Sequence, residues 1–256
     1  MVRKPVITES ELKTLIACPR LFHLGGSIYN LEPSQTFVRY ALRLLNIKLL
    51  KPVKDIDLLI NDCVNKAYLK VFVNQEIEDN VIVGLKSYAF TFLNNYLNYF
   101  NAKEYTMILG PTKPLLEFED ISLRLDLEAV FKQNNRTKFL HAICFYPKVD
   151  QHVLSSDITL RAKALYLKQY ASFSIPKEKH EEVTIHLIGL PRYNKYKAKH
   201  SPHLYLHKKY NLSQEHLPDI KEYVDLAVNN KNINIAPPYC PNTNCLKRNV
   251  CNVELR

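Results

Sequence analysis

The hydrophobic periodicity of this chain changes near residue 100, and this change constrains the fold more than any other feature. Over residues 8–100 the apolar residues recur at helical spacing, ending with the stretch VIVGLKSYAFTFLNNYLNYF. Over residues 105–145 they alternate with polar residues, which is the period of a half-buried strand. A helical pattern returns over residues 156–173, and two more strand-like stretches follow it. This order predicts a mixed α/β core with a helical insertion.

Capping and turn residues place the ends of several elements. SELKTLIA predicts a first helix with Ser10 as its N-cap. Ser156 or Asp157 is expected to cap the helix that follows the first strands, and a short helix should open near Pro218. Strands are expected at TMILGPTKPLLEFE, ISLRLDLEAVF, KFLHAICFY, VTIHLIGLPR and HLYLHKKY, with the polar turn QNNRTK between the second and the third.

Composition narrows the class of protein. The 256 residues are 46% apolar and 23% charged, which is typical of a soluble globular protein with a sizeable core. There are five glycines and no glycine-rich phosphate loop. No run of eighteen apolar residues occurs, so no membrane span is expected. The N-terminus MVRKPVITES is basic but lacks an apolar segment, which predicts no signal peptide and a cytoplasmic location.

The net charge is +10, with a sequence pI near 9.2. A basic balance of this size favours an anionic partner, and nucleic acid is the commonest one. The alternative is a cytosolic protein from a lysine- and asparagine-rich proteome, which composition does not distinguish.

Three cysteines crowd the tail PPYCPNTNCLKRNVC, namely Cys240, Cys245 and Cys251. Their C-x4-C and C-x5-C spacing allows the thiolates to converge on one metal. Disulfides are the alternative, but an intracellular protein keeps its thiols reduced. A zinc knuckle usually has a closer pair of cysteines, whereas the wider spacing suits an iron–sulfur cluster. A fourth ligand is available in Cys18, which should end the first helix because Pro19 follows it.

The segment SELKTLIACPRLF at one end and the C-x4-C-x5-C tail at the other resemble the iron–sulfur branch of the PD-(D/E)XK nucleases. This branch includes the CRISPR-adaptation exonucleases and the AddB-type nuclease domains. The resemblance implies a [4Fe–4S] cluster, with zinc as the alternative metal, that joins the two ends of the chain. Its ligands would be Cys18, Cys240, Cys245 and Cys251.

The resemblance also implies the fold class and the domain organisation. The fold would be α/β, with a restriction-endonuclease-like mixed sheet as its core. A single domain is expected over residues 1–256. Within it we expect a helical N-terminal region and insertion at 8–100, a nuclease-like core at 105–211, and a C-terminal helix with the cysteine cluster at 212–256.

The catalytic residues of that family are only partly present. Phosphodiester hydrolysis needs carboxylates to hold Mg²⁺ or Mn²⁺ and a lysine nearby. The family places an aspartate on one strand, matched here by Asp126, and an acid-x-lysine on the next strand. The next strand has His141–Phe145 at that place, with no acid and no lysine. Of the family's glutamine-x-x-x-tyrosine only Tyr166 matches, since Ala162 replaces the glutamine. We therefore expect a degenerate active site with little or no nuclease activity.

The stretch LPRYNKYKAKHSPHLYLHKKYN combines cations with aromatic rings, a composition that suits a single-stranded nucleic acid. The alternative is a solvated loop between strands, with its tyrosines packed on the core. Arg20 and the pair Arg39 and Arg43, four residues apart on one helical face, are further candidates. The candidate nucleic-acid-binding residues of the stretch are Arg192, Tyr193, Lys195, Tyr196, Lys197, Lys199, Lys208 and Lys209.

Three hypotheses about function follow. In the first, the chain is a DNA-binding subunit of a DNA-processing complex, beside an active nuclease, helicase, integrase or transposase. In the second, it is an active metal-dependent DNA exonuclease or endonuclease with a rearranged site that recruits Asp126, Glu128 and either Glu117 or Glu119. In the third, the metal only ties the termini together and the protein is structural.

Overall fold

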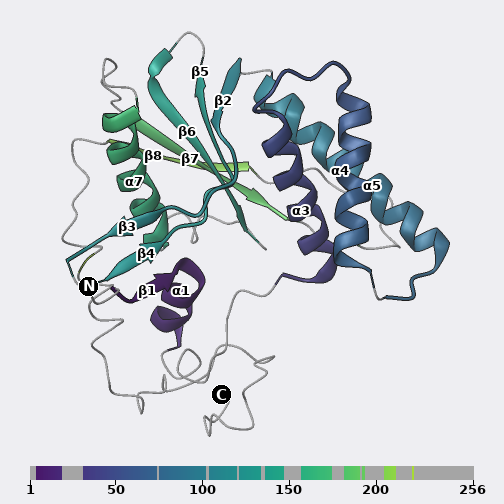
Figure 1. The fold of residues 1–256 in the computed structure, drawn as a ribbon, viewed down its shortest axis with the longest axis horizontal. Helices are drawn as coiled ribbons and strands as arrows, with labels where there is room; N and C mark the ends of the chain where they lie inside the picture. The colour runs from purple at the N-terminus through teal and green to yellow at the C-terminus, as the bar shows by residue number, and fades with distance from the viewer. Residues whose placement is uncertain are drawn as a thin grey trace, which may run out of the picture.

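The fold is described here from a computed structural model. It describes residues 4–18, 31–73, 75–101, 104–119, 121–133, 136–146, 157–174, 182–190, 192–193, 205–211 and 221. Over these residues the chain forms a mixed α/β structure in which helices pack on both faces of a large sheet (Figure 1). The α/β class predicted from the periodicity is therefore confirmed.

The helices follow the apolar patterns of the sequence. They are α1 (Glu9–Ala17), α3 (Pro33–Lys48), α4 (Ile56–Val71), α5 (Asp79–Asn101) and α7 (Ile158–Ser174). Pro33 opens α3, where its missing N–H costs nothing, and Glu32 with Gln35 forms a capping box at the same end. Among the described helices none is both long and apolar enough to cross a membrane.

The large sheet has the strand order β2-β5-β6-β7-β8. These strands are β2 (Tyr105–Leu109), β5 (Ala129–Gln133), β6 (Arg136–Tyr146), β7 (Glu182–Gly189) and β8 (Tyr205–Asn211). Neighbours are antiparallel except β6 and β7, which run parallel over eight paired positions. The segment between these two parallel strands contains α7, as a parallel pair requires a crossover connection.

A smaller sheet lies beside the large one and has the order β1-β4-β3. Its strands are β1 (Val6–Thr8), β4 (Ser122–Arg124) and β3 (Leu115–Glu117). The strand predicted over residues 106–119 is therefore two strands in different sheets, separated by a segment that holds Pro111 and Pro114. The strand predicted over 121–131 is likewise divided, because the chain leaves the small sheet after β4 and joins the large sheet at β5.

The described side chains of the central strands β5, β6 and β7 are mostly buried on both faces of the large sheet. Phe131 and Ile143 face the helices α3, α4 and α5 and belong to one core cluster. Leu140, Ala142 and Cys144 face α7 and belong to another. Figure 1 shows α7 on one side of the sheet and the three-helix group on the other. A sandwiched strand needs apolar residues at successive positions, which explains the run HAICF in β6.

Candidate functional site

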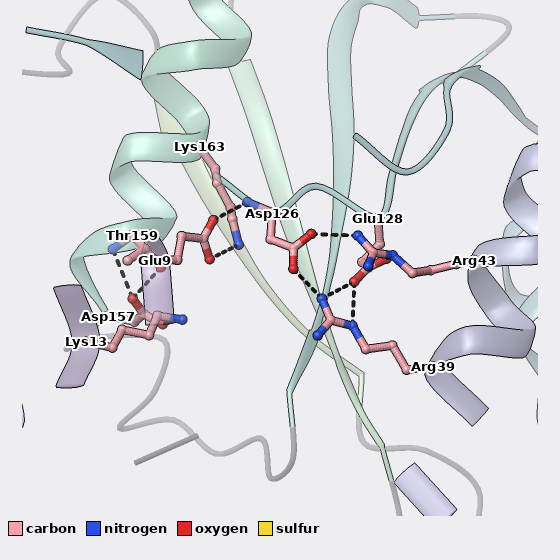
Figure 2. A network of polar contacts seen from close by, with 9 residues as sticks. All are labelled: Glu9, Lys13, Arg39, Arg43, Asp126, Glu128, Asp157, Thr159 and Lys163. Carbon is pink, nitrogen blue, oxygen red and sulfur yellow. Dashed lines mark hydrogen bonds and ion pairs between the residues drawn. The ribbon is translucent and has the colours of Figure 1, made fainter. Parts of the chain in front are cut away.

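Asp126 lies in the short connection between β4 and β5 rather than within a strand. Leu125 and Leu127 on either side of it are fully buried and anchor the connection. The alternation leaves Asp126 and Glu128 on the opposite side, where both carboxylates point toward α3 (Figure 2). The spacing of two residues places these two acids on a common face, although the backbone there is not a continuous strand.

Two arginines of α3 meet the two carboxylates. Arg39 places Nη2 2.5 Å from Asp126 Oδ2 and 2.5 Å from Glu128 Oε1, and its Nε donates to the same Glu128 oxygen at 2.7 Å. Arg43 donates from Nη2 to Asp126 Oδ1 at 2.7 Å. Its Nε lies 2.8 Å from Glu128 Oε2 without the alignment of a hydrogen bond. Each carboxylate therefore contacts both guanidinium groups. We call these four residues the arginine–carboxylate cluster.

The formal charges of the arginine–carboxylate cluster sum to zero. Mg²⁺ demands near-octahedral oxygen ligands, and here the carboxylate oxygens are already engaged by guanidinium nitrogens. A divalent cation would have to displace both arginines from Asp126. Consistently, no group of three or more His, Cys, Asp or Glu side chains is arranged to hold a metal among the residues that the structure describes.

The two acids of the arginine–carboxylate cluster differ in how far they are buried. The Glu128 side chain is 1% exposed, whereas that of Asp126 is 28% exposed. Burial alone would raise the pKa of Asp126, but the charges of Arg39 and Arg43 outweigh it and hold that pKa below its ordinary value. Burial raises the pKa of Glu128, and the same two guanidinium groups oppose that effect. Burial would lower the pKa of Arg39, yet the two carboxylates raise it further. Arg39 therefore keeps its positive charge.

A second group of charges approaches Asp126 from the other side. Glu9 accepts a hydrogen bond from the backbone N–H of Asp126 at 2.7 Å through Oε1, and its Oε2 lies 2.9 Å from Lys163 Nζ (Figure 2). Lys163 is buried on α7, and its exposed fraction is only 2%. Burial would lower the pKa of Lys163, but the Cys144 sulfur and the Glu9 carboxylate raise it, so the ammonium keeps its charge.

The position of Glu9 follows from the start of α1. Thr8 is the N-cap, and it forms a capping box with Glu11: the Glu11 N–H donates to Thr8 Oγ1, and the Thr8 N–H donates to Glu11 Oε2. The prediction of Ser10 as N-cap was wrong, because Thr8 is the residue with a glutamate three positions later. The prediction for α7 was correct in part, since Asp157 accepts from the N–H of Thr159 at 2.9 Å.

The acid and the lysine absent from β6 are thus supplied near Asp126 by other elements, Glu9 from α1 and Lys163 from α7. They are paired with each other, and the contact with Asp126 is made to its backbone. This arrangement holds charges in place, and it presents no free carboxylate to a metal at Asp126. Tyr166, the other residue matched to the family, lies one turn after Lys163 and packs partly buried against the core.

The polar residues of α3 that face the sheet follow a regular spacing in the sequence. Gln35, Arg39, Arg43 and Asn46 recur at helical spacing along one side of α3. Gln35 donates from Nε2 to the carbonyl of Leu190, and Asn46 donates from Nδ2 to that of Glu128 at 3.1 Å. The polar residues form the seam between α3 and the sheet. A polar stripe inside an amphipathic helix marks such a seam.

Of the eight nucleic-acid-binding residues predicted in the stretch 192–209, two have described side chains. Arg192 is 72% exposed and lies 3.0 Å from Glu32. Tyr193 is partly buried, its ring centroid lies 5.8 Å from that of Tyr88, and its hydroxyl occupies the space beside Gly84. That packing corresponds to the alternative in which tyrosines of this stretch rest on the core. Lys208 and Lys209 lie in β8, one of the two outer strands of the large sheet among the residues that the structure describes. Lys195, Tyr196, Lys197 and Lys199 lie outside the described residues.

Of the four predicted cluster ligands, only Cys18 is described. It is the C-cap of α1, half-buried, with extended backbone, and its N–H donates to the Thr14 carbonyl at 2.7 Å. Cys240, Cys245 and Cys251 lie outside the described residues.

No protein-family model and no curated protein matches this sequence. Among solved structures, the crystal structure of SSO0001 aligns over 82% of this chain and 89% of its own, with 10% identity and a TM-score of 0.27.

Proposed function

We propose that this protein binds DNA without cleaving it, as a subunit of a DNA-processing complex in the cytoplasm. The observation that carries the proposal is the arginine–carboxylate cluster: Asp126 and Glu128, the acids expected to hold a catalytic metal, each contact two guanidinium groups. Two guanidinium groups thus stand where a nuclease would place Mg²⁺ or Mn²⁺. The net charge of +10 supports binding of a polyanion.

The proposal includes the fold family and the metal. The chain would be a PD-(D/E)XK-like protein of the iron–sulfur branch, with a [4Fe–4S] cluster, or zinc, held by cysteines from both ends. The half-buried position of Cys18 at the C-terminal end of α1 supports this, since the helix does not enclose its thiol completely. The protein partner would be a nuclease, helicase, integrase or transposase, which would supply the chemistry that this chain lacks.

Binding and cleavage are tested on one sample of anaerobically purified protein. Fluorescence anisotropy would measure the affinity for labelled single-stranded and duplex DNA over a range of salt concentrations. We expect binding with a steep salt dependence and no cleavage with Mg²⁺ or Mn²⁺. Replacing Lys195, Lys197 and Lys199 with glutamine should weaken binding and flatten the salt dependence. The matched control replaces Lys48, Lys66 and Lys70, on α3 and α4, in the same way. Equal effects of the two triple variants would contradict the assignment of that stretch.

A second candidate function is metal-dependent nuclease activity from a rearranged site. The specific observation in its favour is the pair Glu9 and Lys163, which brings an acid and a lysine next to Asp126. Cleavage would then require Arg39 and Arg43 to leave the carboxylates when DNA binds. Cleavage by the wild-type protein that disappears in Asp126→Asn would support this candidate and overturn the non-catalytic proposal.

A further inference from the structure

Two buried histidines of the large sheet lie against the C-terminal end of α5. His141 of β6 and His186 of β7 are 7% and 3% exposed, and His141 Nδ1 lies 3.0 Å from His186 Nε2. Tyr99 of α5 places its hydroxyl 3.4 Å from the other ring nitrogen of His186, Nδ1. Polar contacts therefore connect α5 through β7 to β6. We call His141 and His186 the histidine pair.

Aromatic rings from three elements enclose the histidine pair. The ring of Tyr105, in β2, stacks on that of His141 with centroids 4.3 Å apart and an interplanar angle of 26°. Phe100, in the last turn of α5, stands edge-on to His186 at 5.9 Å. Phe100 also stacks on Phe131 of β5, with centroids 4.8 Å apart. The end of α5 is thus packed on the sheet directly over the two imidazoles.

The hydrogen bond within the histidine pair limits how many protons the pair can hold. One ring nitrogen must donate and the other must accept, so the accepting nitrogen carries no proton. When both rings are protonated, both facing nitrogens carry a hydrogen, and two positive charges lie side by side away from water. We propose that the histidine pair is an acid-sensitive switch, which holds the end of α5 on the sheet and releases it when both imidazoles are protonated.

The other titratable groups that face the pair do not change charge in weak acid. Those of α5 and β2 are the phenols Tyr99 and Tyr105, and phenols ionise far above the range of histidine. Burial raises the pKa of Tyr105, as does its neighbour Tyr99. At the positions paired with His141, β5 contributes Phe131 and β7 contributes Thr184. The β8 positions on the same face, whose side chains lie outside the described ones, are His207 and Lys209.

The connection between α5 and β2 favours release of the helix end. Glu104, the exposed residue before Tyr105, has a φ of 55°, which is uncommon for a residue other than glycine. Such a backbone persists only while the packing on both sides of it imposes it. Release of α5 would remove that constraint. This inference does not depend on the proposed function, because neither DNA nor a metal takes part in it.

The direction of the pH effect follows from proton counting. The packed histidine pair holds at most one proton, whereas two separated imidazoles hold two. The packed state therefore loses stability as the pH falls. With the ordinary imidazole pKa of about 6.5, one additional proton on the released state shifts the equilibrium toward it by about ten-fold between pH 7.5 and pH 5.5.

Amide hydrogen exchange of the full chain, read by mass spectrometry and corrected for the intrinsic effect of pH, would test the switch. Between pH 7.5 and pH 5.5, residues 93–100 of α5 should lose about ten-fold more protection than α7 in the same molecule. His186→Gln places an amide near the position of Nε2 and leaves one imidazole, so the additional loss should disappear. His141→Asn does the same from the other side, through the position of Nδ1.

The matched control is Tyr96→Phe, which removes the buried hydrogen bond from the Tyr96 hydroxyl of α5 to Asn46 Oδ1 at 2.8 Å. It should lower the protection of α5 equally at both pH values and keep the ten-fold difference. The proposal is overturned if α5 and α7 of the wild type lose protection to the same extent, or if the additional loss persists in a folded His186→Gln or His141→Asn variant. The comparison of the two helices in the wild type decides the question even where a variant fails to fold.

Discussion

Arg39 donates from a single guanidinium nitrogen to Asp126 at 2.5 Å, although the two residues are 87 positions apart in the chain. The contact joins α3 to the connection between the two sheets, and the same nitrogen also reaches Glu128. Removing Arg39 would therefore leave the buried carboxylate of Glu128 with only one of its two cations, Arg43.

Arg39→Ala should lower the free energy of unfolding by about 3 kcal/mol, because breaking a buried ion pair leaves an uncompensated charge. Urea unfolding followed by circular dichroism would measure the change. Adding Glu128→Gln to Arg39→Ala should recover part of the loss, since the orphaned charge is then gone. The control is Lys66→Ala, which breaks the exposed pair with Asp62 and should have a much smaller effect. Equal losses of unfolding free energy in Arg39→Ala and Lys66→Ala would show that the buried cluster stabilises the fold no more than an exposed ion pair does.

The stability of the fold should depend on pH through Asp126. Its folded-state pKa lies below the ordinary value of 3.8, so its contribution is present above pH 3.8 and is lost as the pH falls through the folded value. Asp126→Asn should therefore flatten the acid limb of the curve of unfolding free energy against pH. Glu128 should affect stability in the opposite direction, because burial raises its pKa. Its contribution to the unfolding free energy is present below its ordinary pKa and is lost as the pH rises through the folded-state pKa. Chemical denaturation at several pH values below 6 would compare Asp126→Asn with Glu128→Gln, and curves that move in the same direction would contradict this assignment.

Gly84→Ala should destabilise the protein, although the substitution usually stabilises a helix interior by about 1 kcal/mol. Gly84 lies inside α5, and a Cβ atom there would overlap the Tyr193 hydroxyl. Overpacking of this kind costs about 1–3 kcal/mol. In the background of Tyr193→Ala the sign should reverse, because the hydroxyl and its ring are gone. Thermal unfolding of the four proteins of this double-mutant cycle measures the coupling, and additive effects would show that Tyr193 does not rest on Gly84 in solution.

Cys18→Ala should lower the metal content and the stability about as much as Cys245→Ala does, although the two residues lie near opposite ends of the chain. The reason is the proposed cluster, in which each thiolate is one of four ligands. Iron, sulfide and zinc would be quantified on anaerobically purified variants, with Cys63→Ala as the control, because Cys63 is buried in α4 among apolar residues. Unchanged metal content in Cys18→Ala would remove this cysteine from the ligand set.

Local pattern predicted the type of most described elements. The apolar spacing of VIVGLKSYAFTFLNNYLNYF identified α5, and the run HAICF identified β6, because each is a property of one segment. The alternation in ISLRLDLEAVF also predicted one strand, and the chain instead divides it between two sheets. Which sheet a strand joins depends on what packs against it, and alternation along one strand does not contain that information.

The candidate site shows the same limit. The family resemblance implies a role for Asp126, and the spacing of four residues places Arg39 and Arg43 on one helical face. Their contact was not predictable, because it depends on how α3 is placed on the sheet. The pairing of Glu9 with Lys163 depends on α1 and α7 in the same way. The residue types were visible in the sequence, but their partners were decided by tertiary packing.

Because the four charges of the arginine–carboxylate cluster cancel within a few ångströms, the cluster produces almost no electric field at a distance. An approaching polyanion is neither attracted by Arg39 and Arg43 nor repelled by Asp126 and Glu128. The long-range attraction of this molecule must then arise from cations elsewhere on its surface. A substitution at one of those surface cations would therefore change the long-range field of the molecule without changing the balance of charge within the cluster.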